Sequence, residues 1–261
     1  MIIKDQLNRE LSIDSAPTRV VSLVPSLTEL LCDLGLMEKL VGVTKFCIHP
    51  VGIRKHASII GGTKQVKIDS CLKLKADFIL ANKEENIEHQ IESLSENGID
   101  VFVSDISDHS DLEILIEKLG IIFEIENDAK KLKQELEESI ESLESHRVNH
   151  APKATYLIWK KPFMAAGGDT YISYILKKLG ISNALGKELR YPTLSESQLK
   201  ELDTDIILLS SEPYPFRQSH IEELTKLTGK KVILVDGEFF SWYGTRILHM
   251  KNYAKQLTSQ L

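Results

Sequence analysis

The chain contains few cysteines and no long hydrophobic run, and both absences restrict its class. The three cysteines, Cys32, Cys47 and Cys71, are an odd number without a C-x-x-C pair, so we expect no disulfide framework. There is no run of about 18 apolar residues, and the N-terminal segment has no apolar stretch of signal-peptide length. We therefore expect no membrane insertion. We expect a cytoplasmic location for the chain as given, or a periplasmic one if a signal was removed.

Excess positive charge and two catalytic motifs are also missing. The formal net charge is −6, which argues against a nucleic-acid partner. Neither the phosphate loop G-x-x-x-x-G-K-[ST] nor the nucleophile elbow G-x-S-x-G is present. We predict a monomeric protein that is not an enzyme and requires no cofactor.

Helical and strand periodicities alternate along the chain. Residues 2–13 predict a hairpin, and residues 44–63 predict a long loop with little helix. Ser26 and Glu29 form an S-x-x-E pattern, which predicts a capping box at the start of the first helix. Short apolar runs predict strands at 19–24, 40–43, 77–81, 100–103, 155–158, 206–209 and 231–235. Helical spacing predicts helices at 26–34, 69–74, 87–94, 112–119, 170–179 and 247–257. Such alternation indicates mostly parallel sheets covered by helices.

A long helix separates two similar halves. Residues 127–147 contain no Gly or Pro, and their apolar positions define one helical face. After this segment, residues 194–209 repeat the pattern of residues 68–80: a short helix, a turn ending in aspartate, and a buried strand. We predict an α/β fold of two Rossmann-like lobes, 1–126 and 150–261, joined by a backbone helix at 127–149. Ligands bind at the carboxyl ends of parallel strands, so we expect the ligand in the cleft between the lobes.

Several motifs carry a resemblance to a known family. Residues 19–31 (RVVSLVPSLTELL), residues 40–44 (LVGVT) and the pair 74–80 (LKADFIL) and 202–208 (LDTDIIL) resemble substrate-binding proteins of the vitamin B12, haem and iron-siderophore ABC importers. The cobalamin-binding branch is the most similar. The resemblance implies the class III periplasmic-binding-protein fold (the helical-backbone metal receptor type). It also implies cobalamin, haem or a ferric siderophore as ligand and an ABC permease as partner.

The same resemblance implies two docking residues and one departure from the family. Each lobe of such proteins presents an acidic residue to the permease, and the matching positions are Asp69 and Glu196 or its neighbour Ser197. A ring-stacking tryptophan is expected after the second glycine of Gly61-Gly62, but Thr63 and Lys64 follow that glycine.

The predicted ligand-binding residues lie in loops that follow strands, and many are aromatic or basic. Tyr and Trp have a flat apolar body with a polar edge, which suits a planar ligand. Basic side chains, namely Lys45, Lys64, Lys83, Lys160 and Arg246, would favour an anionic ligand. The full predicted set is Ser26, Lys45, Phe46, Cys47, His49, Lys64, Lys83, Glu84, Trp159, Tyr191, Tyr214, Phe240, Trp242, Tyr243 and Arg246.

The pair Cys47 and His49 leaves several interpretations open. One interpretation is a buried thiol beside a loop histidine, a second is direct contact with the ligand, and a third is a thiolate and an imidazole that bind a transition metal. A catalytic thiol on the same scaffold would also need an orienting third group. The alternatives to an importer component are therefore an enzyme that uses Cys47 and His49, and a cytoplasmic carrier or sensor of a corrinoid or metal chelate.

Overall fold

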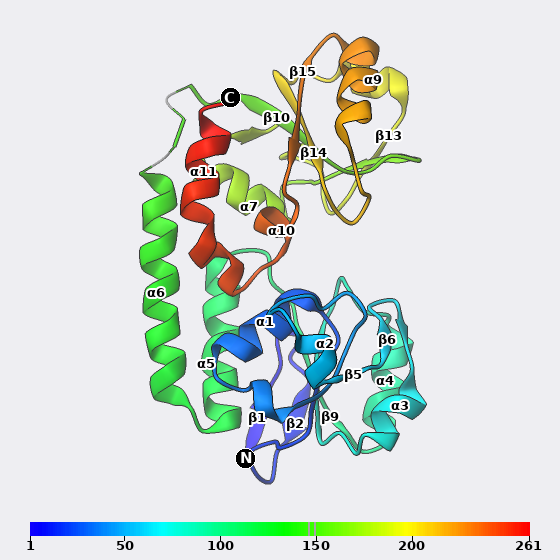
Figure 1. The fold of residues 1–261 in the computed structure, drawn as a ribbon, viewed down its shortest axis with the longest axis vertical. Coiled ribbons are helices and arrows are strands. Elements are labelled where there is room, and N and C mark those ends of the chain that lie inside the picture. Colours follow the sequence, from blue (N-terminus) through cyan, green and yellow to red (C-terminus); the bar gives the residue numbers. More distant parts are fainter. Residues whose placement is uncertain (146, 149) are drawn as a thin grey trace. The chain divides into compact units, whose positions relative to one another are not determined.

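The structure, a computed structural model, describes residues 1–145, 147–148 and 150–261. The chain divides into unit 1, which comprises Met1–Glu135 and Tyr243–Thr245, and unit 2, which comprises Leu136–Trp242 and Arg246–Leu261 (Figure 1). His146 and Asn149, which fall in the predicted linking helix, lie outside the described residues. The predicted lobe boundaries stay predictions. Within the described ranges, no helix is long and apolar enough to span a membrane.

Unit 1 is built on a five-stranded sheet in which all strand pairs are parallel, with the order β5-β4-β3-β8-β9. These strands are β3 (Val20–Ser22), β4 (Leu40–Val43), β5 (Ser58–Ile59), β8 (Phe78–Asn82) and β9 (Asp100–Ser104). Two antiparallel hairpins accompany the sheet: β1 (Ile2–Lys4) with β2 (Glu10–Ser12), and β6 (Gly61–Gly62) with β7 (Gln65–Val66). The helices are α1 (Pro25–Asp33), η1 (Met37–Lys39), α2 (Ile53–His56), α3 (Ile68–Lys73), α4 (Glu88–Glu96) and α5 (His109–Phe123).

The central strands of unit 1 are buried along their whole length. Every residue of β3 and β8 is buried, as expected for parallel strands covered by helices on both faces. The α5 helix packs Phe123 against Phe78 of β8, with the ring centroids 5.5 Å apart. The central strands therefore form the core of unit 1 and offer no exposed side chains of their own.

Unit 2 contains a mixed six-stranded sheet. The order is β13-β11-β10-β14-β15, and β12 also pairs with β10. The pairs β10·β12, β10·β14 and β14·β15 are parallel, whereas β11 runs antiparallel to β10 and β13. The strands are β10 (Lys153–Trp159), β11 (Phe163–Ala165), β12 (Ser182–Asn183), β13 (Thr193–Leu194), β14 (Ile206–Ser210) and β15 (Lys231–Val235). The helices in this part of the chain are α7 (Tyr171–Lys178), α8 (Glu196–Glu201), α9 (Gln218–Thr228), α10 (Glu238–Ser241), η2 (Thr245–His249) and α11 (Met250–Thr258).

A long helix, α6 (Glu126–Glu144), begins in unit 1 and ends in unit 2. Its buried residues are Ala129, Leu132, Leu136, Ile140 and Leu143, which form the predicted apolar face. A Cβ on Gly120 of α5 would lie 2.7 Å from the Cβ of Ala129, so glycine allows α5 and α6 to approach closely. The predicted α/β architecture with two lobes, mostly parallel sheets and one long helix is confirmed.

Three details differ from the sequence-based expectations. The capping box at Ser26 is wrong: α1 begins at Pro25, Val24 is the N-cap residue, and no side chain caps the helix. Proline supplies the helical φ at the first position and has no N–H that needs a partner, so the helix starts before Ser26. The α9 helix was not predicted, because its residues are mostly polar. The segment 44–63 has little helix, as expected, because α2 has only 4 residues, but it also contains the short strands β5 and β6.

The repeated aspartate motif has the same structural role in both units. Asp77, just before β8, accepts hydrogen bonds from the backbone N–H groups of Thr18 and Arg19, both at 2.9 Å. Asp205, just before β14, accepts one from the N–H of Lys153 at 2.7 Å. In each unit the aspartate therefore holds the start of the neighbouring parallel strand, β3 or β10.

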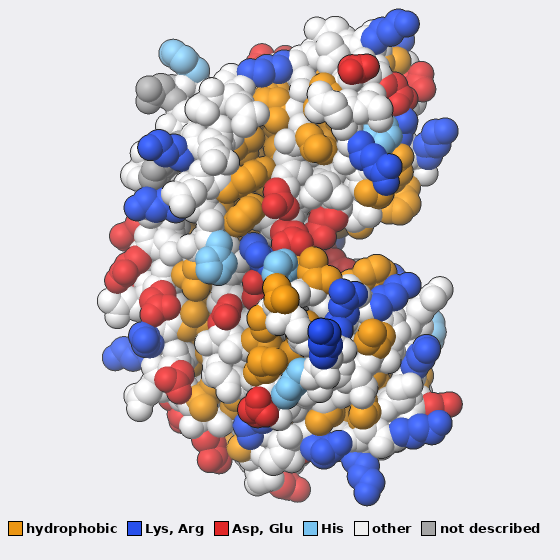
Figure 2. All heavy atoms as spheres, viewed as in Figure 1, with side chains coloured by type: hydrophobic (Ala, Val, Ile, Leu, Met, Phe, Trp, Pro, Cys, Tyr) orange, Lys and Arg blue, Asp and Glu red, His pale blue; other side chains and the backbone are white. Residues whose placement is uncertain are grey.

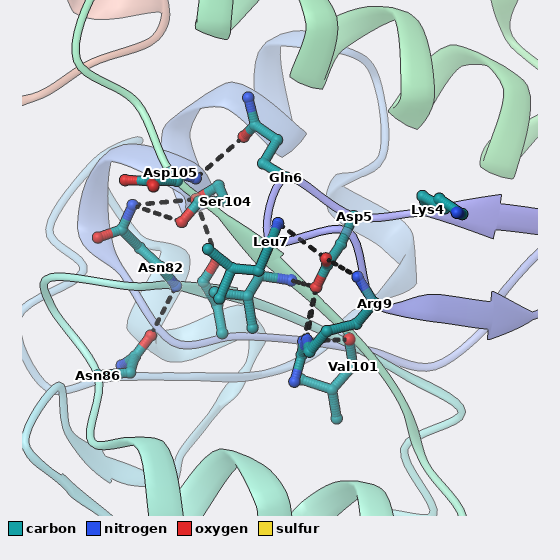
Figure 3. A network of polar contacts seen from close by, with 12 residues as sticks. Lys4, Asp5, Gln6, Leu7, Arg9, Asn82, Asn86, Val101, Ser104 and Asp105 are labelled. Carbon is teal, nitrogen blue, oxygen red and sulfur yellow. Dashed lines mark hydrogen bonds and ion pairs between the residues drawn. The ribbon is translucent and has the colours of Figure 1, made fainter.

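The N-terminal hairpin is bonded to β9 through Asp5. Asp5 is buried and accepts hydrogen bonds from the N–H groups of Leu7 and Arg9 and from the Arg9 side chain. It also accepts one from the N–H of Val103 in β9, at 3.2 Å. Figure 3 shows the Asp5 carboxylate bonded to Leu7 and Arg9. The adjacent Gln6 side chain accepts a hydrogen bond from the N–H of Asp105 at 3.1 Å. The hairpin therefore fixes the end of β9, next to the loop that follows β8.

Replacing Asp77 with Asn should lower the free energy of unfolding at pH 7, because the amide has one acceptor oxygen for two N–H donors. The loss should be only about 1 kcal/mol, because water screens the charge of an exposed carboxylate. Burial raises the pKa of Asp77, but the hydrogen bonds from Thr18 and Arg19 outweigh burial and lower it. The charged carboxylate therefore stabilises the fold at pH values above its pKa in the unfolded chain, about 3.9. This stabilisation is lost as the pH falls through the lower pKa of the folded state.

Urea unfolding at pH 7 and at pH 3 measures this difference. The gap between the wild type and Asp77→Asn should narrow at pH 3, whereas the control Asp14→Asn, at an exposed position, should change little at either pH. An equal gap at both pH values would show that the carboxylate charge is not what matters.

Candidate functional site

The carboxyl edge of the unit 1 sheet gathers most of the predicted site residues of the first lobe. Ser26 lies in the first turn of α1 after β3, Lys45–His49 follow β4, and Lys83 and Glu84 follow β8. These strands pair in parallel, so their following loops share one edge. The β6–β7 hairpin is attached to this edge, because the N–H of Lys45 donates to the carbonyl of Gly61 at 2.8 Å.

A buried amide network fixes the loop after β8. Asn82 accepts hydrogen bonds from the N–H groups of Glu84 and Glu85, at 2.9 and 3.2 Å, and its own amide donates to the Ser104 side chain at 3.1 Å (Figure 3). Asn86 accepts from the N–H of Asn82 at 2.8 Å and donates to the carbonyl of Thr63 at 3.0 Å. Asn86 thus joins this loop to the turn of the β6–β7 hairpin.

Two glycines allow close approaches at the hairpin, one to the backbone and one to a side chain. Gly61 has a φ of +117°, and a Cβ there would lie 2.2 Å from the carbonyl oxygen of Gln65. A Cβ on Gly62 would lie 3.2 Å from the Phe46 ring. The ring is half exposed, at 50%, and the Lys45 ammonium lies 4.9 Å from its centroid. The exposed part of Phe46 offers an apolar surface beside a cation.

Cys47 is buried beneath this edge. Its sulfur lies 3.1 Å from the Thr28 hydroxyl and 3.2 Å from the Thr44 hydroxyl, and it has no exposed surface. Burial raises the pKa of the thiol, which disfavours the thiolate that both metal binding and nucleophilic attack require. Within the described ranges, no three His, Cys, Asp or Glu side chains are grouped to hold a metal ion. The geometry supports the interpretation of a buried thiol beside a loop histidine, His49, which is half-buried.

The carboxyl edge of the unit 2 sheet carries an aromatic cluster. Trp159 ends β10, is 39% exposed, and donates its indole N–H to the carbonyl of Lys161 at 3.2 Å. Tyr214, which follows β14, packs edge-on against Trp159 with ring centroids 5.6 Å apart. Phe216 and His220 continue the cluster at 4.7 and 5.7 Å from Tyr214. Tyr191 is half-buried in the loop before β13.

Three predicted aromatic residues that follow β15 are almost completely buried. A ring needs an exposed face to stack on a ligand. Phe240 has no exposed surface and packs against Tyr156, with ring centroids 5.0 Å apart, so it is a core residue of unit 2. Trp242 is 7% exposed and donates its indole N–H to Glu212 at 2.6 Å. Tyr243 is 6% exposed. The ligand-binding role of Trp242 and Tyr243 stays a prediction.

Three of the five predicted cations form ion pairs. Lys83 pairs with Asp105 at 2.6 Å. Lys160 pairs with Glu223 at 2.5 Å. Arg246 lies 3.5 Å from Glu238 and 5.0 Å from the Trp242 ring centroid. These partners reduce the positive charge that the three side chains can offer to a ligand.

The predicted docking residues lie at the starts of corresponding helices in the two units. Asp69 lies in the first turn of α3 and Glu196 in the first turn of α8, and both are exposed. Ser197 is exposed as well, and its hydroxyl lies 2.9 Å from that of Ser195, the N-cap residue of α8. Both acidic groups are therefore accessible on their units.

Sequence reasoning missed the side chains that hold the site together. Asn82 is the last residue of the buried strand β8 and Asn86 follows four residues later. Asparagine side chains commonly bond neighbouring backbone groups. Glu212, which also accepts a hydrogen bond from the Ser241 hydroxyl at 2.8 Å, follows β14 in the same way. A polar residue at or just after the end of a buried strand is the sequence feature that could have identified these side chains.

Comparisons with known proteins agree on one family. Residues 20–234 match the family described as "Periplasmic binding protein". A "Vitamin B12-binding protein" of Photorhabdus laumondii is 27% identical over 252 residues, which cover 96% of this chain and 90% of that protein. An "Uncharacterized ABC transporter substrate-binding lipoprotein" of Bacillus subtilis is 25% identical over 214 residues, covering 79% and 68%. The structure of a periplasmic heme-binding protein from Roseiflexus sp. RS-1 superposes with a TM-score of 0.78 at 18% identity, covering 92% and 96%.

We expect the three cysteines of the native protein to resist alkylation at pH 8. Burial raises the pKa of Cys47, and it raises the pKa of Cys32 to about 12 and that of Cys71 to about 11, so little thiolate is present. Iodoacetamide labelling followed by peptide mass spectrometry measures this, and all three should react once guanidinium unfolds the chain. Rapid labelling of Cys47 in the native protein would contradict this expectation and would support a catalytic or metal-binding thiol.

Proposed function

The chain belongs to the periplasmic binding protein family, and from this membership we propose that it binds a metal chelate, namely a corrinoid, haem or a ferric siderophore, and delivers it to an ABC-type permease. The names of its relatives support this choice: one is called a vitamin B12-binding protein and another an ABC transporter substrate-binding lipoprotein. A structural neighbour is called a heme-binding protein.

The observation that carries the proposal is a large, partly exposed ring at the carboxyl edge of each sheet. Phe46 is 50% exposed on unit 1 and Trp159 is 39% exposed on unit 2. Each ring is held in place, Phe46 over Gly62 and Trp159 by its hydrogen bond to Lys161 and its contact with Tyr214. Fixed, flat apolar surfaces lose little entropy when a large planar ligand covers them.

The alternative functions have no observation in their favour. An enzyme that uses Cys47 and His49 would need a reactive thiol, and the Cys47 thiol is buried with a raised pKa. Nothing favours a cytoplasmic carrier or sensor over an importer component. The location of the chain, its monomeric state and ligand binding between the lobes stay predictions.

A thermal-shift screen with cyanocobalamin, haem, ferric siderophores and free metal ions tests the proposed ligand class. A chelate at a hundred times its dissociation constant should stabilise the protein by about 2.7 kcal/mol, because it binds only the folded state. Free Fe³⁺, Co²⁺ and Zn²⁺ should give no shift. If free metal ions stabilise the protein and no chelate does, the proposed ligand class is wrong.

Reversing the charge of the two docking residues tests the delivery step. Asp69→Lys with Glu196→Lys should reduce chelate uptake by the native host at least tenfold, because each change places a cation where the permease is expected to present one. The dissociation constant for the chelate should stay within about twofold, because neither residue is among those expected to contact the ligand. The control pair Glu92→Lys and Glu222→Lys, at exposed positions on α4 and α9, should leave uptake intact. Equal uptake by both pairs would exclude this docking surface.

A further inference from the structure

The ion pairs of the predicted cations leave two lysines available for a ligand. Lys83, Lys160 and Arg246 each lie close to a carboxylate. Within residues 1–145, 147–148 and 150–261, Lys45 and Lys64 form no ion pair. Both are exposed on unit 1. The structure thus narrows the predicted basic set to two side chains.

Both lysines are braced on the same hairpin. The N–H of Lys45 bonds to the carbonyl of Gly61 at 2.8 Å, and the Lys45 Cε lies 3.5 Å from where a Gly62 Cβ would be. Lys64 lies in the turn of this hairpin and donates from its ammonium to the carbonyl of Glu84. That carbonyl orients the ammonium without neutralising its charge.

Two side chains hold the hairpin, and a third holds the neighbouring segment that carries Lys45. Asn86 donates to the carbonyl of Thr63 at 3.0 Å, and Gln90 accepts from the N–H of Val66 at 3.0 Å. Arg54 donates to the carbonyl of Lys45 at 3.1 Å, and its guanidinium adds a third positive charge to this segment. The two ammonium groups are therefore attached to a fixed backbone, so binding an anion costs little further ordering.

Among the described ion pairs, no acidic group near the hairpin pairs with Lys45 or Lys64. Glu84 and Glu85 follow β8, and Lys64 acts on the Glu85 carboxyl electrostatically without an ion pair. Asp105 is engaged by Lys83 at 2.6 Å. Lys45 and Arg54, on the other side of the hairpin, have no such neighbour among the described ion pairs. Figure 2 shows basic and hydrophobic side chains next to each other on the surface of unit 1.

We propose that Lys45 and Lys64 recognise the carboxylate or phenolate oxygens of an anionic chelate, whose apolar body lies on the exposed face of Phe46. This inference rests on the proposed function and narrows its ligand class from chelates in general to those with a negative rim. Charge-assisted hydrogen bonds are the stronger kind, so the two ammonium groups would select against neutral chelates of the same size.

Matched probes separate the anionic class from the neutral one. Haem, with two propionates, and a ferric tricatecholate are anionic. Haem dimethyl ester, cyanocobalamin and a neutral ferric trihydroxamate are not. At least one anionic probe should bind with a dissociation constant roughly ten- to a hundredfold below those of the neutral probes. Its affinity should fall as salt is raised from 0.05 to 0.5 M.

Variants then test the two lysines. Lys45→Met and Lys64→Met, which keep the apolar stem, should each weaken the anionic probe about tenfold or more. Lys45→Arg and Lys64→Arg should stay within threefold of the wild type. Lys73→Met, which removes the same charge from exposed α3, is the control and should have no effect. Unchanged melting temperatures of the unliganded variants would confirm that each folds.

The outcomes distinguish this inference from the proposed function. Preferential binding of a neutral probe, or equal affinity of both Met variants and the Lys73→Met control for the anionic probe, would overturn the inference while leaving a chelate-binding protein. Binding of none of the five chelates would overturn the proposed function and the inference with it.

Discussion

Parallel strand pairing is the constraint on which the site of each unit depends. In unit 1, β3 pairs with β4 and β8 in the same direction, so the segments after these strands must leave the sheet at one edge. The same pairing buries both faces of the central strands, so their polar residues, such as Ser22 and Asn82, are buried as well. Chemistry is therefore confined to the loops, and the sheet decides which loops are neighbours. In unit 2 the parallel pair β10·β14 brings Trp159 and Tyr214 together in the same way.

Parallel pairing needs its register fixed at the strand starts, and the repeated aspartates do this. Asp77 bonds the segment before β3, while the N–H of Asp77 itself donates to the carbonyl of Arg19 at 3.0 Å. Asp205 repeats both bonds with Lys153. A reciprocal pair of hydrogen bonds sets one register and no other. The short sequence repeat thus performs the same local task twice, and a match of only a few residues was enough to indicate two similar halves.

The parts of the fold that depend on local periodicity could be predicted, whereas those that depend on long-range partners could not. The strands and the long helix follow from apolar spacing, and α6 keeps the expected face from Leu132 to Leu143. The start of α1 could not be decided by pattern alone, because Pro25 and a Ser26 capping box compete and only the backbone conformation of Val24 shows which prevails. Likewise, no pattern distinguishes Phe240, whose ring packs on Tyr156, from Phe46, whose ring is half exposed. Both follow strands, and only tertiary packing separates them.

The charge of the site is the hardest property to predict from sequence. Whether a lysine can bind an anionic ligand depends on which carboxylate lies beside it in the fold. Lys83 and Lys64 are equivalent in sequence terms, each a lysine in a turn at a strand end. Lys83 meets Asp105, whose N–H is bonded by Gln6 of the N-terminal hairpin. That hairpin is itself fixed to β9 by buried Asp5. Asp105, the ion-pair partner of Lys83, is thus held by a residue about a hundred positions before it in the sequence. Lys64, in contrast, bonds only a carbonyl. The electrostatic character of the carboxyl edge is therefore a property of the whole unit, and it is set partly by elements that lie outside the loops that form the edge.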